Sequence, residues 1–248
     1  MNDQLRAELL KQRSTPTILG LLVGMLGLIL FAVLLHGLGL PARELEDRDN
    51  QLTVLGRGEF LAVLFAALLG AVSITAEFRH GTIRPTLVAM PRRGRILAAK
   101  LSASMLAGAT LGVIGCAVAA AVGAAALHAR GIEIQLTVGD YALLVAGGGA
   151  AAALWAAIGV GIGAVVRNQV PALVGICAWL LFVEGLLVGD VASVTKVGRF
   201  GPGAAAEALS GQHAGTLLDP AISLALLAFY ATATSVASVI AMTKRDVW

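Results

Sequence analysis

Residues 101–129, LSASMLAGATLGVIGCAVAAAVGAAALHA, contain no Lys, Arg, Asp or Glu. A helix needs about 20 apolar residues to cross the hydrocarbon core of a bilayer, so this stretch is long enough to span a membrane. The whole chain is similarly apolar, since 58% of its 248 residues are hydrophobic, 13% are charged, and the mean hydropathy is +0.85. A soluble domain of this length needs a more polar surface than these residues can supply. We therefore expect an all-α membrane protein.

Charge-poor stretches along the rest of the chain predict six transmembrane helices in all. We expect these spans near residues 17–40, 59–76, 98–127, 141–166, 170–188 and 220–242. None of them alternates with a period of two residues, as a strand of a membrane barrel would. The pattern predicts a single transmembrane domain over residues 1–248.

The basic residues predict how this domain lies in the membrane. Six spans put both termini on the same side, and loops rich in Lys and Arg stay in the cytoplasm. The side of the termini carries twelve basic residues and the other side six (Arg6, Lys11, Arg13, Arg79, Arg84, Arg92, Arg93, Arg95, Lys100, Arg167, Lys244 and Arg245 against Arg43, Arg48, Arg57, Arg130, Lys196 and Arg199). We therefore expect an inner-membrane protein with both termini in the cytoplasm.

Motifs of catalysis and cofactor binding are absent from the sequence. The chain has no G-x-x-x-x-G-K-[ST] phosphate loop, no HExxH, no CxxC and no G-x-S-x-G. Its four histidines fall in different segments, which disfavours a metal site, and Cys116 and Cys177 are expected to be packing residues within spans. Glu184 is the clearest acid within a predicted span. We expect no catalytic residue, no bound cofactor and no metal, so any energy for work must come from another protein.

The N-terminal residues 1–15 predict a short helix in the membrane interface. Leu5 and Leu9 share one helical face, and a polar side is supplied by charged residues (Arg6, Glu8, Lys11 and Arg13). Pro16 suits the first turn of the helix that follows. The alternative is a frayed basic tail that only sets the orientation of the chain.

The connection between the second and third predicted spans is longer than a turn requires. Residues 74–100 read ITAEFRHGTIRPTLVAMPRRGRILAAK, with apolar side chains between basic ones and with Gly81 and Pro91 as boundaries. This pattern predicts a short amphipathic helix parallel to the membrane. A solvated basic loop is the alternative.

The same connection resembles the E-F/Y-R-x-G-T-I/L-x-x-x-L…P-x-R…K stretch of ABC-2 type transporter permeases, above all the six-span bacitracin-resistance type. Eight residues fall where that pattern expects them (Glu77, Arg79, Gly81, Thr82, Leu87, Pro91, Arg93 and Lys100). The sequences GPGAAAEAL at 201–209 and KRDV at 244–247 are similar to the ends of such permeases. The specific motifs cover about forty residues, while the topology covers the whole chain.

The resemblance implies a division of labour with a separate motor. In such transporters two permease copies or paralogues form the pathway, and two cytoplasmic ATPase subunits bind ATP and Mg²⁺. The resemblance implies that the ATPase contacts the interfacial helix and the helix after the second span. The implied coupling surface comprises Glu77, Arg79, Gly81, Thr82, Ile83, Arg84 and Leu87. The expected partners are these subunits and the lipid bilayer, and no nucleic acid.

The connection from residue 189 to residue 219 is too apolar for a plain solvated loop. The resemblance implies short re-entrant helices at the outer mouth of the pathway, and residues 204–209 are prone to form a helix. Glu184 is a candidate for an outer gate, and the alternative is a carboxylate that reaches water at the interface. By contrast, the mixed charges of residues 42–50 predict a solvated loop.

Four G-x-x-x-G pairs allow close approach of helices, within one chain or between two (Gly20/Gly24, Gly108/Gly112, Gly159/Gly163 and Gly185/Gly189).

The favoured function is a permease subunit of an ATP-driven exporter of a hydrophobic or amphipathic compound. The alternative from another class is a membrane-embedded adaptor or sensor that docks a cytoplasmic protein without transport. A self-sufficient carrier is disfavoured, because the spans show few ionisable residues and no visible repeat.

Overall fold

The computed structural model describes residues 2–82, 93–188 and 197–244. Within these ranges the chain is almost entirely helical and has no strand. Six helices are long and apolar enough to span a membrane, which confirms the predicted all-α membrane fold. They are α2 (Pro16–Gly39), α3 (Arg48–Arg79), α5 (Arg93–Ala129), α6 (Val138–Val166), α7 (Gln169–Ala178) with its continuation to residue 188, and α11 (Pro220–Lys244).

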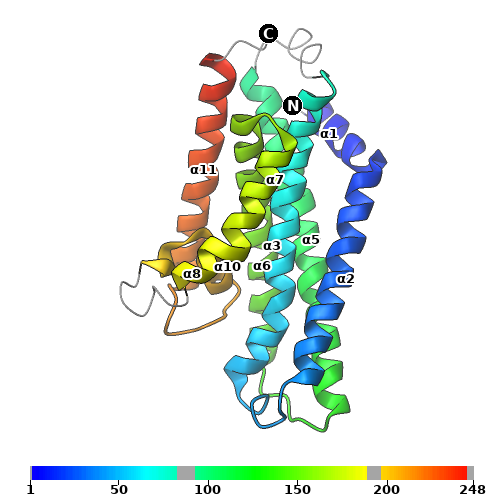
Figure 1. The fold of residues 1–248 in the computed structure, drawn as a ribbon, viewed down its shortest axis with the longest axis vertical. Coiled ribbons are helices and arrows are strands. Elements are labelled where there is room, and N and C mark those ends of the chain that lie inside the picture. Colours follow the sequence, from blue (N-terminus) through cyan, green and yellow to red (C-terminus); the bar gives the residue numbers. More distant parts are fainter. Residues whose placement is uncertain (1, 83–92, 189–196, 245–248) are drawn as a thin grey trace.

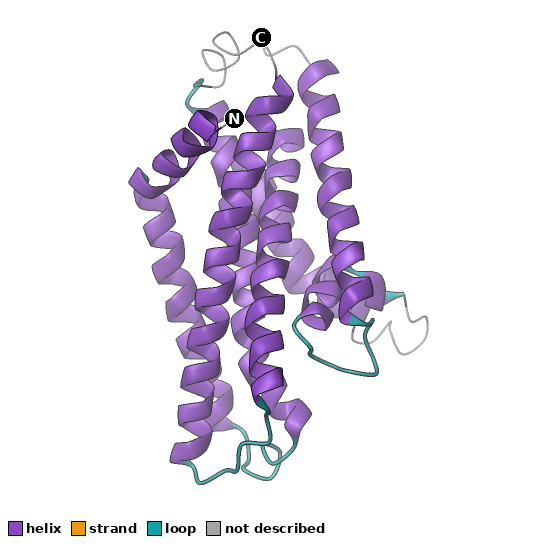
Figure 2. Ribbon diagram, turned by 180° about the vertical axis from the view of Figure 1, so that it is seen from behind, coloured by secondary structure: helices purple, strands orange, loops and turns teal. Residues whose placement is uncertain are grey.

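The spans form an elongated bundle around a pair of central helices (Figure 1). Helices α3 and α6 pack against each other and both contact α5, while α2 lies against α3 and α5 on one side. Helix α11 packs on α6, and α7 packs on α3 and α6. A shorter helix, α1 (Asn2–Ser14), lies obliquely across the end of the bundle where α3 and α11 end (Figure 2). We call this the α1 end of the molecule.

Glycines bring the central helices into close contact. A Cβ atom added at Gly70 of α3 would lie 2.0 Å from the Ala156 carbonyl oxygen, and one added at Gly159 of α6 would lie 2.0 Å from that of Ala67. Of the four predicted G-x-x-x-G pairs, Gly108/Gly112 and Gly159/Gly163 make such close contacts within the chain. In contrast, a Cβ at Gly20 or Gly185 would meet nothing within 4 Å.

Helix α3 begins at Arg48 rather than at Glu59, where the charge pattern placed the start of the second span. Asp47 caps it by accepting hydrogen bonds from the backbone N–H groups of Asp49 and Asn50. Gln51 is fully buried and its side-chain amide donates to the carbonyl oxygens of Leu45 and Glu133, at 2.8 and 2.9 Å. Residues 42–50 are largely exposed, as their mixed charges predicted, but Leu45 is buried and the last three residues already belong to α3.

Short helices follow α7 and turn back into the bundle. The chain passes through a π-helical turn, η1 (Trp179–Val183), and α8 (Glu184–Val188), and later through η2 (Gly198–Phe200) and α10 (Pro202–Leu209). The predicted helix at residues 204–209 is thus present. The end of α10 and the residues just after it contact α3 at Gly56 and α6 at Gly147. These two glycines lie about 12–14 Å along their helices from the first residue, at 1.5 Å per residue. Figure 1 shows α10 beside the middle of the bundle.

Candidate functional site

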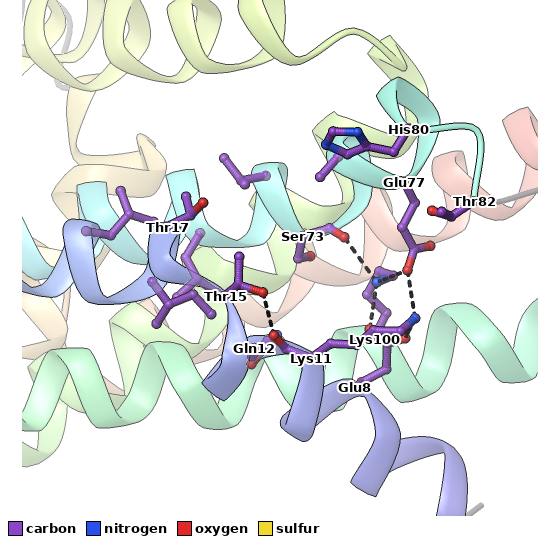
Figure 3. A pocket seen from close by; sticks show the side chains of 15 residues that line it. Glu8, Lys11, Gln12, Thr15, Thr17, Ser73, Glu77, His80, Thr82 and Lys100 are labelled. Atoms are coloured by element: carbon purple, nitrogen blue, oxygen red, sulfur yellow. Dashed lines mark hydrogen bonds and ion pairs between the residues drawn. The ribbon is translucent and has the colours of Figure 1, made fainter.

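Lys100 of α5 is buried at the α1 end, where it joins three helices (Figure 3). Its Nζ lies 2.7 Å from Glu8 Oε2 of α1 and 3.1 Å from Glu77 Oε1 of α3, and it donates to the Ser73 carbonyl oxygen at 3.1 Å. Lys100 is only 2% exposed. A buried ammonium is stable only when such partners replace its water, so these contacts fix the relative positions of α1, α3 and α5.

Lys11 completes the cluster from the more exposed side. Its Nζ lies 2.9 Å from Glu8 Oε1 and 3.1 Å from Glu77 Oε1. Two lysines and two glutamates thus balance in charge, and we call these four residues the inner ion network. Burial alone would raise the pKa of Glu8, but Lys100 and Lys11 more than offset that effect and hold it below its ordinary value. Burial likewise lowers the pKa of Lys11, whereas Glu8 and Glu77 bring it above the ordinary value.

A helix is present at the predicted position, but its faces differ from the prediction, and its place in the membrane interface stays a prediction. Glu8 and Gln12 are each 8% exposed and face the bundle, so part of the polar side of α1 meets protein rather than water. Leu5 and Leu9 are half-buried, and Arg6 is exposed. Nothing in the sequence indicated that Glu8 faces the bundle, because its partner is Lys100, 92 positions along the chain. The side chain of Arg13 lies outside the described residues.

The predicted coupling surface divides between an inward and an outward part. Glu77 points into the inner ion network, and its side chain is 12% exposed. Arg79, Gly81 and Thr82 are exposed and follow it directly, with Gly81 at a φ of +68° that suits a glycine. Ile83, Arg84 and Leu87, and with them the predicted amphipathic helix, lie outside the described residues. The structure therefore links the first residue of this surface to α1 and α5.

Arg167 makes a second link at the same end. It ends α6 in a left-handed conformation, with φ of 58°. Its guanidinium lies 5.6 Å from the ring centroid of Phe78 and donates to the Ala241 carbonyl oxygen of α11 at 2.7 Å. A guanidinium over an aromatic face is a favourable contact, so the end of α3 next to Glu77 is also joined to α6 and α11.

Glu184 binds the N-terminus of α10. One carboxylate oxygen accepts hydrogen bonds from the backbone N–H groups of Gly203 and of Ala204, the latter at 3.0 Å. A carboxylate is favourable there because the first N–H groups of a helix lack partners and carry partial positive charge. Glu184 is 5% exposed, so the alternative prediction that it reaches water is wrong. Its placement joins the end of the fifth span to α10, and its role as a gate stays a prediction.

Glu59 was missed as a buried acid of the second span. It is 1% exposed, and Gln212 donates to its Oε2 at 3.2 Å. In the sequence this charge marked the beginning of a span, whereas in the structure it lies within α3, beside the segment that follows α10. A helical pattern continued back to the Asp47 cap would have placed it correctly. Among the described residues no group of three or more His, Cys, Asp or Glu side chains could hold a metal ion.

The arrangement at the α1 end suits a mechanical connection between helices. The inner ion network pairs each of its charged groups with one of opposite sign. A comparison with curated proteins finds no match. The sequence model of a protein family, described as ABC-2 family transporter protein, matches residues 4–184. This range is more than half of the chain and includes the whole inner ion network. The chain therefore belongs to the ABC-2 transporter family and is a permease of that type.

Proposed function

We propose that this chain is the permease subunit of an ATP-driven exporter in the bacterial inner membrane. Two cytoplasmic ATPase subunits would bind ATP and Mg²⁺, and a second permease copy or a paralogue would complete the substrate pathway. The excess of basic residues on the side of the termini supports a cytoplasmic α1 end. Membership of the ABC-2 transporter family supports the permease role.

The single observation that carries this proposal is the position of Glu77. It is held between Lys11 and Lys100, five residues before Thr82, the last described residue of the connection to the third span. A partner that displaces this connection would move Glu77. Because the ion pairs with Lys11 and Lys100 hold Glu77 against α1 and α5, these helices would move with it. The displacement would pass to the other spans as a rigid-body motion.

The exported compound is proposed to be hydrophobic or amphipathic, such as a drug, an antibiotic or a lipid. The described spans consist mainly of Ala, Gly, Val, Leu and Ile, and a pathway between such helices favours apolar cargo. Buried acids such as Glu59 and Glu184 are the exceptions, and both already accept hydrogen bonds from the chain.

The test is to purify the full chain from its native membrane and identify the proteins that accompany it. We expect a protein with a phosphate loop and ATPase activity, and ATP-dependent movement of amphipathic compounds after reconstitution of the complex in liposomes. Binding of the ATPase without transport of any compound tested would favour the adaptor or sensor. Absence of an ATPase partner would contradict the proposal.

A further inference from the structure

A cavity of about 440 Å³ lies between α1, the first turns of α2 and the last turns of α3 (Figure 3). Its apolar part is formed by Ile18 and Leu21 of α2 and by Leu69 and Val72 of α3. At its polar part lie Lys11 and Glu77 of the inner ion network. The cavity is therefore amphipathic, with its apolar part toward the spans and its charged part toward α1.

The cavity lies where the chain turns from a polar helix into a spanning one. Helix α1 ends at Ser14 and α2 begins at Pro16. Leu19 and Val23, on the outer face of α2, are 64% and 61% exposed, as expected for side chains that meet lipid. Under the proposed orientation this turn is level with the headgroups of the cytoplasmic leaflet, so an amphiphile can enter from the bilayer.

The carboxylate of Glu77 offers an acceptor to such an amphiphile. Its Oε1 accepts hydrogen bonds from Lys11 and Lys100, whereas its Oε2 accepts no hydrogen bond from any described residue. A carboxylate oxygen only accepts hydrogen bonds, so the matching group on a ligand is a hydroxyl or an ammonium. An ammonium is favoured because it also brings opposite charge.

The beginning of α2 offers the complementary charge. The hydroxyl of Thr15 donates to the Lys11 carbonyl oxygen at 2.5 Å and does not cap α2. Thr15 and Thr17 at the beginning of α2 line the cavity, so the positive end of the helix dipole lies beside it. The ammonium of Lys11, whose side chain is 55% exposed, adds to it. A phosphate is the group that such a site attracts.

We propose that this cavity binds one phospholipid of the cytoplasmic leaflet with a primary ammonium headgroup, of the phosphatidylethanolamine class. One acyl chain lies against Leu21 and Leu69, the phosphate lies at the start of α2, and the ammonium donates to Glu77 Oε2. The bound lipid braces α1 against α3 and so supports the inner ion network. This inference rests on the proposed orientation of the chain, but not on its coupling to an ATPase.

The test compares two lipids that differ only in their donors. The full chain is reconstituted in nanodiscs with equal amounts of phosphatidylethanolamine and phosphatidylcholine of identical acyl chains, and the lipid that stays bound in mild detergent is measured by native mass spectrometry. We expect one retained lipid for each chain and a preference of about tenfold for phosphatidylethanolamine, because the trimethylated headgroup cannot donate to the carboxylate. This measurement uses the wild-type chain and needs no variant.

Two variants localise the lipid. Leu21→Trp fills the apolar part of the cavity and should abolish retention, whereas Leu19→Trp points away from it and should retain the lipid. Equal retention of both lipids, or retention by Leu21→Trp equal to that of the wild type, would overturn the site. Release of the lipid during ATP turnover by the complex would also overturn it, because the lipid would then be cargo. Failure to find an ATPase partner would leave the lipid measurement unaffected.

Discussion

The Nζ atom of Lys100 lies 2.7 Å from Glu8 Oε2, although 92 positions of sequence separate the two residues. Both are nearly excluded from solvent, with exposed fractions of 2% and 8%. Removal of one partner of a buried ion pair leaves the other charge without compensation, which is far more costly than loss of a surface pair. This contact therefore ties the position of α1 to that of α5.

Replacement of Lys100 by Met should detach α1. The expected cost is about 3–5 kcal/mol, because Glu8 and Glu77 would lose their shared buried partner. Cross-linking of cysteines at positions 12 and 104 by a short bifunctional thiol reagent reports the attachment, since Gln12 Nε2 and Ser104 Oγ lie 3.4 Å apart. Lys11→Met is the matched control and should reduce this cross-linking less, because Lys11 is half exposed. Unchanged cross-linking in Lys100→Met would contradict the assignment.

Acid should release α1 through Glu8. Because the pKa of Glu8 is lowered in the folded protein, its contribution is complete above its ordinary value of 4.5 and is lost as the pH falls through the lowered value. The pKa of Lys11 is raised, so its contribution is complete below 10.5 and is lost as the pH rises through the raised value. A fluorophore on a cysteine at exposed position 7, with Cys116 and Cys177 replaced by Ser, should show a transition below pH 4.5. The same acid transition in Glu8→Gln would argue against this cause.

Loss of the Glu184 carboxylate should loosen α10. Glu184→Ala leaves the N–H groups of Gly203 and Ala204 without an acceptor and should cost about 0.5–2 kcal/mol, as for other helix caps. Glu184→Gln keeps an acceptor oxygen and should cost less. Thermal unfolding in detergent measures both, with exposed Glu46→Ala as a control expected to match the wild type. Equal destabilisation by Ala and Gln would show that the negative charge itself is needed, as a gate would require.

Close packing of α3 on α6 should make Gly159 intolerant of a side chain. The Cβ of Gly159→Ala would lie 2.0 Å from the Ala67 carbonyl oxygen, and such overpacking costs about 1–3 kcal/mol or more. Gly27→Ala is the control, because its Cβ would meet nothing within 4 Å. We expect poor yield of folded protein from the first variant and wild-type stability or better from the second. Equal yields of the two variants would show that the helices can separate at low cost.

The spans were predictable from the sequence because a helix that crosses the hydrocarbon core needs about 20 predominantly apolar residues. Residues 101–129 meet this requirement without a charge, and α5 contains all of them. The start of α3 was not predictable in this way. Glu59 and Arg57 lie within the helix because protein, rather than lipid, surrounds that part of it, and the packing of neighbouring helices cannot be inferred from local hydropathy.

The candidate site was predictable only as separate segments. Glu77 was identified from the resemblance, and α1 from its pattern, but nothing local indicates that Glu8 turns toward Lys100. That contact depends on how α1 lies across the bundle, which the register of three helices decides. Glu184 shows the same limit, since the helix that it caps begins 18 residues later, at Pro202.

Coupling through Glu77 is measured by the amount of compound exported for each ATP hydrolysed in liposomes that contain the permease with its ATPase. Glu77→Gln weakens both lysine contacts while it keeps the shape of the side chain, and exposed Glu46→Gln is the matched control. We predict that complexes with Glu77→Gln continue to hydrolyse ATP but export much less compound for each ATP, and that complexes with Glu46→Gln match the wild type. An unchanged ratio in Glu77→Gln, with the protein folded and bound to its ATPase, would contradict the proposed coupling.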